Sequence, residues 1–132
     1  MADDKEPSLE EEPTTAKTVL IVEDDRDVGE FMVQALRLET SYHPLLASDG
    51  FQALKVVREI KPDLLLLDYH LPSMDGLELY DRLHTTKEVA DIPTIMMSAN
   101  LPLRETRERK ITCLTKPIEL DELLHTIEHL LA

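Results

Sequence analysis

A short apolar run between two prolines constrains the fold most strongly. Leu64 to Leu67 lie between Pro62 and Pro72 and are followed directly by Asp68. Because proline interrupts helices, the run is too short for a useful helix, and it is typical of a strand covered on both faces. In an open parallel sheet, the carboxyl ends of the strands border the crevice where ligands bind. The pattern therefore places Asp68 at a ligand-binding edge, with simple turn formation as the alternative.

Similar apolar runs recur along the chain and alternate with helical patterns. They indicate four further strands, at residues 19–22, 42–47, 93–97 and 111–115. Between and after them, apolar residues recur at helical spacing, most clearly from Leu120 to Leu131. Strand and helix alternation of this kind predicts an α/β fold, in which right-handed crossovers build a parallel sheet sandwiched by helices.

Two segments add positional predictions. Pro44 lacks the N–H group that a central strand would need, so its strand is expected at a sheet edge. The segment from Asn100 to Lys110 is highly charged and has few apolar residues, which leaves room for only a shortened fourth helix.

Length and charge define the domain organisation and exclude several classes of protein. The 132 residues suffice for one domain, predicted at 18–132, after an acidic segment at 1–17 that is too polar to fold. A net charge of −13 argues against direct nucleic-acid binding. There is no apolar stretch of membrane-spanning length and no leader pattern, and Cys113 is the one cysteine. We therefore expect a cytoplasmic protein without membrane insertion.

Polar residues follow the predicted strands at one edge. Glu23 and Asp24 follow the first strand, Asp68 ends the third, Ser98 ends the fourth and Lys116 follows the fifth. Crowded carboxylates repel one another unless a hard divalent cation lies among them, and Mg²⁺ suits this set. A lysine and a hydroxyl opposite can bind phosphoryl oxygens. These residues predict an aspartate nucleophile, Asp68, that forms an acyl phosphate.

The segments VLIVEDD, LLLLDYHLPSMDG and the Lys116–Pro117 step resemble the receiver domains of two-component response regulators, from Thr18 to the end of the chain. The resemblance implies a flavodoxin-like, doubly wound, five-stranded parallel sheet with strand order 2-1-3-4-5. It implies that Asp68 is phosphorylated and that Lys116 and Ser98 contact the phosphoryl group. It also implies Mg²⁺ ligation by Asp24, Asp68 and the backbone carbonyl of His70, and by Glu23 through water, and a cis Lys116–Pro117 bond.

The same resemblance implies a partner on each side of the signal. The phosphoryl donor would be a sensor histidine kinase or a phosphotransfer protein. No DNA-binding or catalytic domain follows, so a downstream effector protein is expected to receive the output of a stand-alone regulator. Such a protein is not an enzyme, although it can catalyse its own phosphorylation and dephosphorylation.

The sequence also departs from the family's pattern and leaves two alternatives open. Cys113 stands where the family often has a Tyr or Phe that swings inward on activation, and the stretch between Ser98 and Lys116 is short. An aspartyl-phosphate phosphohydrolase would keep an acid two residues after the nucleophile, where this chain has His70. A pseudo-receiver acting only as a binding module would usually have lost an acid or the lysine, and all are present.

Overall fold

The computed structural model describes residues 16–132, apart from the side chain of Glu88. The acidic segment predicted at 1–17 falls almost entirely outside the described residues, so its character and the domain boundary at Thr18 stay predictions. Within residues 16–132, no helix has both the length and the apolar character needed to cross a bilayer.

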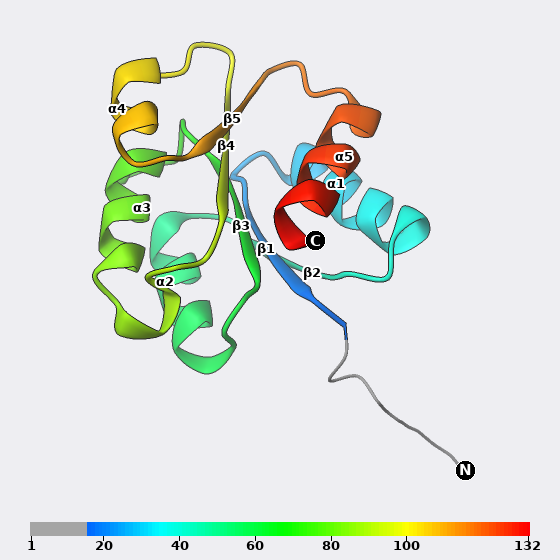
Figure 1. Ribbon diagram of the computed structural model, residues 1–132, viewed down its shortest axis with the longest axis horizontal. Coiled ribbons are helices and arrows are strands. Elements are labelled where there is room, and N and C mark those ends of the chain that lie inside the picture. The colour runs from blue at the N-terminus through cyan, green and yellow to red at the C-terminus, as the bar shows by residue number, and fades with distance from the viewer. Residues whose placement is uncertain (1–15) are drawn as a thin grey trace.

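The centre of the molecule is a parallel sheet with strand order β2-β1-β3-β4-β5, as expected (Figure 1). Its strands are β1 Thr18–Val22, β2 His43–Ala47, β3 Leu64–Asp68, β4 Thr94–Ser98 and β5 Thr112–Thr115. Pro44 lies in the edge strand β2, beside Val19 of β1, so its missing N–H group costs the sheet no hydrogen bond on the open side.

Helices cover both faces of the sheet, with α1 and α5 on one side and α2, α3 and α4 on the other (Figure 1). They are α1 Arg26–Glu39, α2 Gly50–Glu59, α3 Gly76–His84, α4 Leu103–Glu108 and α5 Leu120–Leu131, with a 3₁₀ turn, η2, at Lys87–Val89. The six residues of α4 confirm the predicted shortening of the fourth helix.

The core consists of two layers because side chains alternate across a strand. In β3, Leu65 and Leu67 pack toward α2 and α3, whereas Leu64 and Leu66 pack toward α1 and α5. All four side chains are fully buried. Each buried leucine contributes about 1.5–3 kcal/mol. The strand that ends at Asp68 is therefore firmly held on both faces.

Aspartates cap the three helices that follow the first three strands. The side chains of Asp25, Asp49 and Asp75 accept hydrogen bonds from backbone N–H groups in the first turns of α1, α2 and α3. Each cap contributes about 1 kcal/mol. The caps fix where each helix begins, and so they also fix the loops at the carboxyl edge of the sheet.

The apolar stripe predicted for α1 is only partly buried. Met32 and Leu36 are buried, whereas Val28 is 37% and Phe31 59% exposed. These two side chains line a cavity of about 250 Å³ together with Ile118 and other residues that follow β5. Periodicity predicted the apolar face correctly, but not that its first turns border an open cavity instead of the sheet.

Candidate functional site

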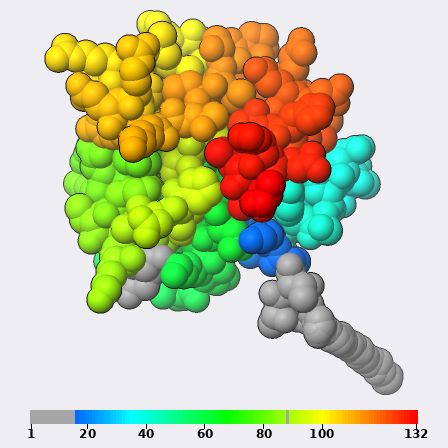
Figure 2. Space-filling view, viewed as in Figure 1, coloured from blue at the N-terminus to red at the C-terminus, as the bar shows by residue number. Residues whose placement is uncertain are grey.

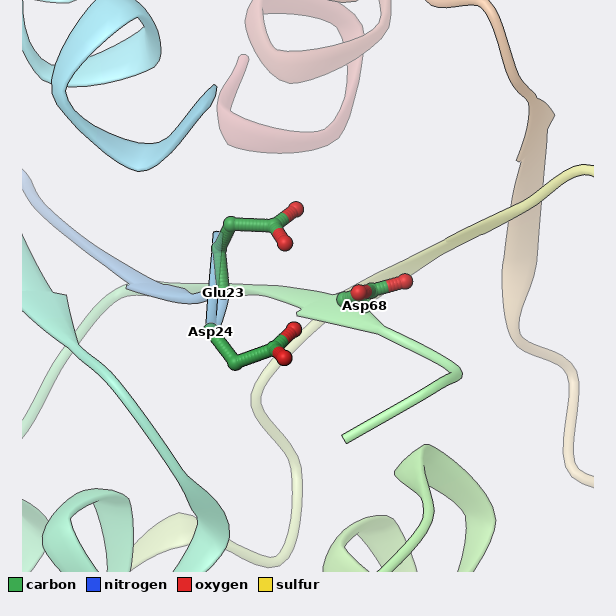
Figure 3. Close-up of side chains that lie close together, drawn as sticks. All are labelled: Glu23, Asp24 and Asp68. Carbon is green, nitrogen blue, oxygen red and sulfur yellow. The ribbon is translucent and has the colours of Figure 1, made fainter. Parts of the chain in front are cut away.

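Three carboxylates meet where two neighbouring strands end. Glu23 and Asp24 follow β1, and Asp68 is the last residue of β3, which pairs with β1. Oxygens from the three groups lie within 4.8 Å of one another, and Figure 3 shows the carboxyl groups of Glu23 and Asp24 pointing toward Asp68. Glu23 is 2% and Asp68 4% exposed, while Asp24 is exposed. The predicted acidic cluster is therefore present in the fold.

Lys116 lies between two of these carboxylates. Its Nζ atom is 3.4 Å from Oε1 of Glu23 and 3.4 Å from Oδ1 of Asp68. The backbone N–H of Lys116 donates to the carbonyl of Ser98, which extends the pairing of β5 with β4 and places the side chain at this edge. The Lys116–Pro117 bond is cis, as the resemblance implied.

The site carries more negative than positive charge. Three carboxylates surround one ammonium group, which leaves two negative charges in excess when all are ionised. Burial raises the pKa of Glu23, and the nearby Asp68 raises it further, against the opposing effects of the Asp25 N–H group and Lys116. Burial alone would lower the pKa of Lys116, but Asp68 and Glu23 more than offset it and hold that pKa above its usual value.

Asp25 positions Glu23, a role that the sequence analysis did not assign. Its backbone N–H donates to Oε2 of Glu23 at 3.1 Å, while its own side chain caps α1. An aspartate directly before a helical pattern is a common N-cap, and this signal could have identified it. The start of α1 therefore helps to hold the Glu23 carboxylate in place.

The loop after Asp68 packs closely against that residue. The N–H of His70 donates to Oδ1 of Asp68 at 3.3 Å, and the N–H of Gly76 donates to the carbonyl of Tyr69 at 2.8 Å. A Cβ atom on Gly76 would lie 2.9 Å from both the carbonyl oxygen of Asp68 and the Cα of Tyr69. Only glycine allows this approach. His70 is exposed, and metal ligation by its carbonyl stays a prediction.

Ser98 lies on the other side of Asp68, in the neighbouring strand. Asp68 pairs with Met97 in β4, so Ser98 is one residue farther toward the carboxyl edge. Its side chain is fully buried, and Oγ accepts a hydrogen bond from the N–H of Asn100 at 3.0 Å. The fold thus brings every predicted site residue to one edge of the sheet, while their chemical roles stay predictions.

The donor set suits a hard divalent cation. All three acidic side chains offer oxygen atoms, two of them are buried, and their charge exceeds that of Lys116. A small ion such as Mg²⁺ binds a few carboxylates and keeps several waters, and the exposed Asp24 leaves the site open to water. The residues therefore fit Mg²⁺ as the predicted cofactor.

Comparison with known proteins gives the same picture of the fold. The profile of a family described as the response regulator receiver domain matches residues 19–128. The sporulation initiation phosphotransferase F of Bacillus subtilis strain 168 is 32% identical over 114 residues, which cover 83% of this chain and 90% of that protein. The transcriptional regulatory protein BaeR of Escherichia coli O6:H1 is 42% identical over 83 residues, which cover 63% of this chain and 33% of that protein.

A solved structure adds the metal. The receiver domain of the sensor histidine kinase PA1611 from Pseudomonas aeruginosa PAO1, described with a magnesium ion coordinated in the active site cleft, superimposes with a TM-score of 0.76 at 26% identity. The match covers 88% of this chain and 98% of that one. Among the first curated relatives, the chain spans only 33% to 50% of their length.

Proposed function

The chain belongs to the response regulator receiver domain family, and on this premise we propose that Asp68 is its phosphoacceptor in a Mg²⁺-dependent reaction. Receiver domains are phosphoacceptor modules of two-component signalling. One observation carries the proposal to this residue: Asp68 is buried at a strand end, within reach of two further carboxylates and an ammonium group. That surrounding can both hold a cation and bind an incoming phosphoryl group.

The two carboxylate oxygens of Asp68 have different environments. Oδ1 accepts the N–H of His70 and lies near Lys116, whereas no hydrogen bond to Oδ2 is found among residues 16–132. One oxygen of Asp68 attacks the phosphorus of a phosphohistidine on a sensor kinase or phosphotransfer protein. The new O–P bond forms as the N–P bond breaks, and the imidazole leaves with its electron pair.

The other site residues stabilise the transferred group. Lys116 pairs with one phosphoryl oxygen, and the Ser98 hydroxyl donates to another. Glu23, Asp24, Asp68 and the carbonyl of His70 would hold Mg²⁺. The ion supplies positive charge that offsets the repulsion between the acidic cluster and the anionic donor.

We propose that the output passes through contacts with an effector protein. Several relatives of this chain are transcriptional regulators that it matches over only part of their length. The proposed role is that of a phosphoacceptor regulator, in which the chain serves its own phosphorylation and dephosphorylation but converts no other substrate.

The test is phosphorylation by acetyl phosphate, read by intact mass and peptide mapping. The wild type should gain one phosphoryl group in Mg²⁺ and none in EDTA, whereas Asp68→Asn should gain none in either. Asp91→Asn, which alters an exposed aspartate before β4, serves as the matched control and should behave as wild type. Equal labelling of Asp68→Asn and wild type would refute the assignment.

A further inference from the structure

The short helix α4 is held by its two ends more than by its own packing. It has six residues, and within this described segment only Thr106 is buried, while Leu103 is 58% exposed. A helix of this length is not stable by itself in water. Contacts with the rest of the molecule must therefore decide where it lies.

The carboxyl end of α4 is tied to α3 by Arg109. The guanidinium of Arg109 donates from Nε and Nη2 to the two carboxylate oxygens of Asp81 at 2.8 and 2.9 Å. It also donates from Nη1 to the carbonyl of Glu105 at 2.9 Å, within the last turn of α4. The hydrogen bond from Arg109 holds the pKa of Asp81 below its usual value, so the aspartate is ionised at neutral pH.

The backbone at this end is tied as well. The hydroxyl of Tyr80 in α3 donates to the carbonyl of Arg109 at 3.1 Å. The N–H of Lys110 bonds to the carbonyl of Arg107, and the N–H of Ile111 to that of Thr106. Since Leu79 and Leu83 bury α3 against the sheet, this anchor is fixed to the core.

The amino end of α4 is attached differently. Pro102, the residue before the helix, makes no side-chain cap. Among the described residues, the hydrogen bond from the N–H of Asn100 to Oγ of Ser98 is the link found between the segment 99–103 and the sheet. That hydroxyl is the one proposed above to donate to the phosphoryl group.

We infer that α4 pivots on phosphorylation: its amino end moves with the Ser98 hydroxyl, while the Asp81–Arg109 anchor holds its carboxyl end against α3. The inference rests on the proposed role of Ser98. When the hydroxyl turns toward the phosphoryl group at Asp68, its bond to the N–H of Asn100 must lengthen or reorient. The segment 99–103 follows, because it has few buried contacts, whereas the double tie at Arg109 does not need to break.

The pivot makes a prediction for single backbone amides, measured by NMR hydrogen exchange with and without Mg²⁺ and beryllofluoride as the phosphoryl mimic. In the wild type, the mimic should change the exchange of Asn100 severalfold and leave Lys110 and Ile111 unchanged. If the mimic altered all three amides equally, the helix would move as a whole and the pivot would be wrong.

Two variants of α3 test the anchor itself. Asp81→Asn should speed the exchange of Lys110 and Ile111 severalfold without the mimic, and should let the mimic affect both ends of α4. Glu78→Gln breaks a similar pair, Glu78 with Arg82 at 2.8 Å on the same helix, without touching α4, and should match wild type. If Asp81→Asn equalled Glu78→Gln in the absence of the mimic, the anchor alone would be refuted. If the mimic changed exchange nowhere in the wild type, the proposed function would fail with the pivot.

Discussion

Replacing Lys116 by methionine should weaken the fold and, at the same time, tighten Mg²⁺ binding. Methionine keeps an unbranched apolar stem but removes the ammonium group that lies 3.4 Å from both Glu23 and Asp68. Breaking a fully buried ion pair costs about 3–5 kcal/mol. The Lys116 side chain is 30% exposed, so solvent screens part of the effect, and we expect a loss of about 1–3 kcal/mol without metal.

The gain in metal affinity follows from Coulomb's law. An ion held by these carboxylates at ordinary Mg²⁺–oxygen distances would lie roughly 5 Å from the ammonium group. Between a single and a double positive charge at that distance, the repulsion is about 2–7 kcal/mol for effective dielectric constants of 80 to 20. Taking the low end, Lys116→Met should bind Mg²⁺ at least about tenfold more tightly.

Isothermal titration calorimetry at low ionic strength measures the affinity, and urea unfolding in EDTA and in saturating Mg²⁺ measures the stability. The stability deficit should shrink when Mg²⁺ is present, because the ion replaces the missing positive charge. Lys61→Met, which removes an exposed lysine before β3, is the control and should change neither quantity. Unchanged or weaker Mg²⁺ binding by Lys116→Met would refute the argument.

Three further variants test single features of the site. Because burial raises the pKa of Glu23, the metal-free fold prefers the protonated carboxyl group, so its stability should fall as pH rises from the ordinary glutamate pKa through the raised one. Glu23→Gln should remove that fall in urea unfolding with EDTA and should weaken Mg²⁺ binding in calorimetry. Gly76→Ala should cost about 1–3 kcal/mol and slow acetyl phosphate labelling of Asp68, because the added Cβ would meet the Asp68 carbonyl oxygen at 2.9 Å; wild-type stability and rate would contradict this. Asp49→Ala removes a cap bond of 2.8 Å to the N–H of Gln52 and should cost about 1 kcal/mol without changing labelling, which would show that stability loss alone does not impair the site.

Local sequence rules were enough to locate the elements and the candidate residues. The prolines around Leu64 to Leu67 allow only a short strand, and that strand ends at Asp68 as predicted. Pro44 selects an edge position because it cannot donate a ladder hydrogen bond. The charged stretch after Asn100 supports only a short helix. These are consequences of chain geometry and local burial. The strand order itself came from the resemblance to a known family.

The tertiary structure alone decided how residues far apart in the sequence meet. Lys116 bridges Glu23 and Asp68 because β5, β4, β3 and β1 lie side by side, and no local pattern contains that distance. The pairing of Asp81 with Arg109 is equally invisible in the sequence, where each is one of many charged residues. The exposure of Phe31 also depends on where α5 packs, since helical periodicity defines an apolar face but not the partner that covers it.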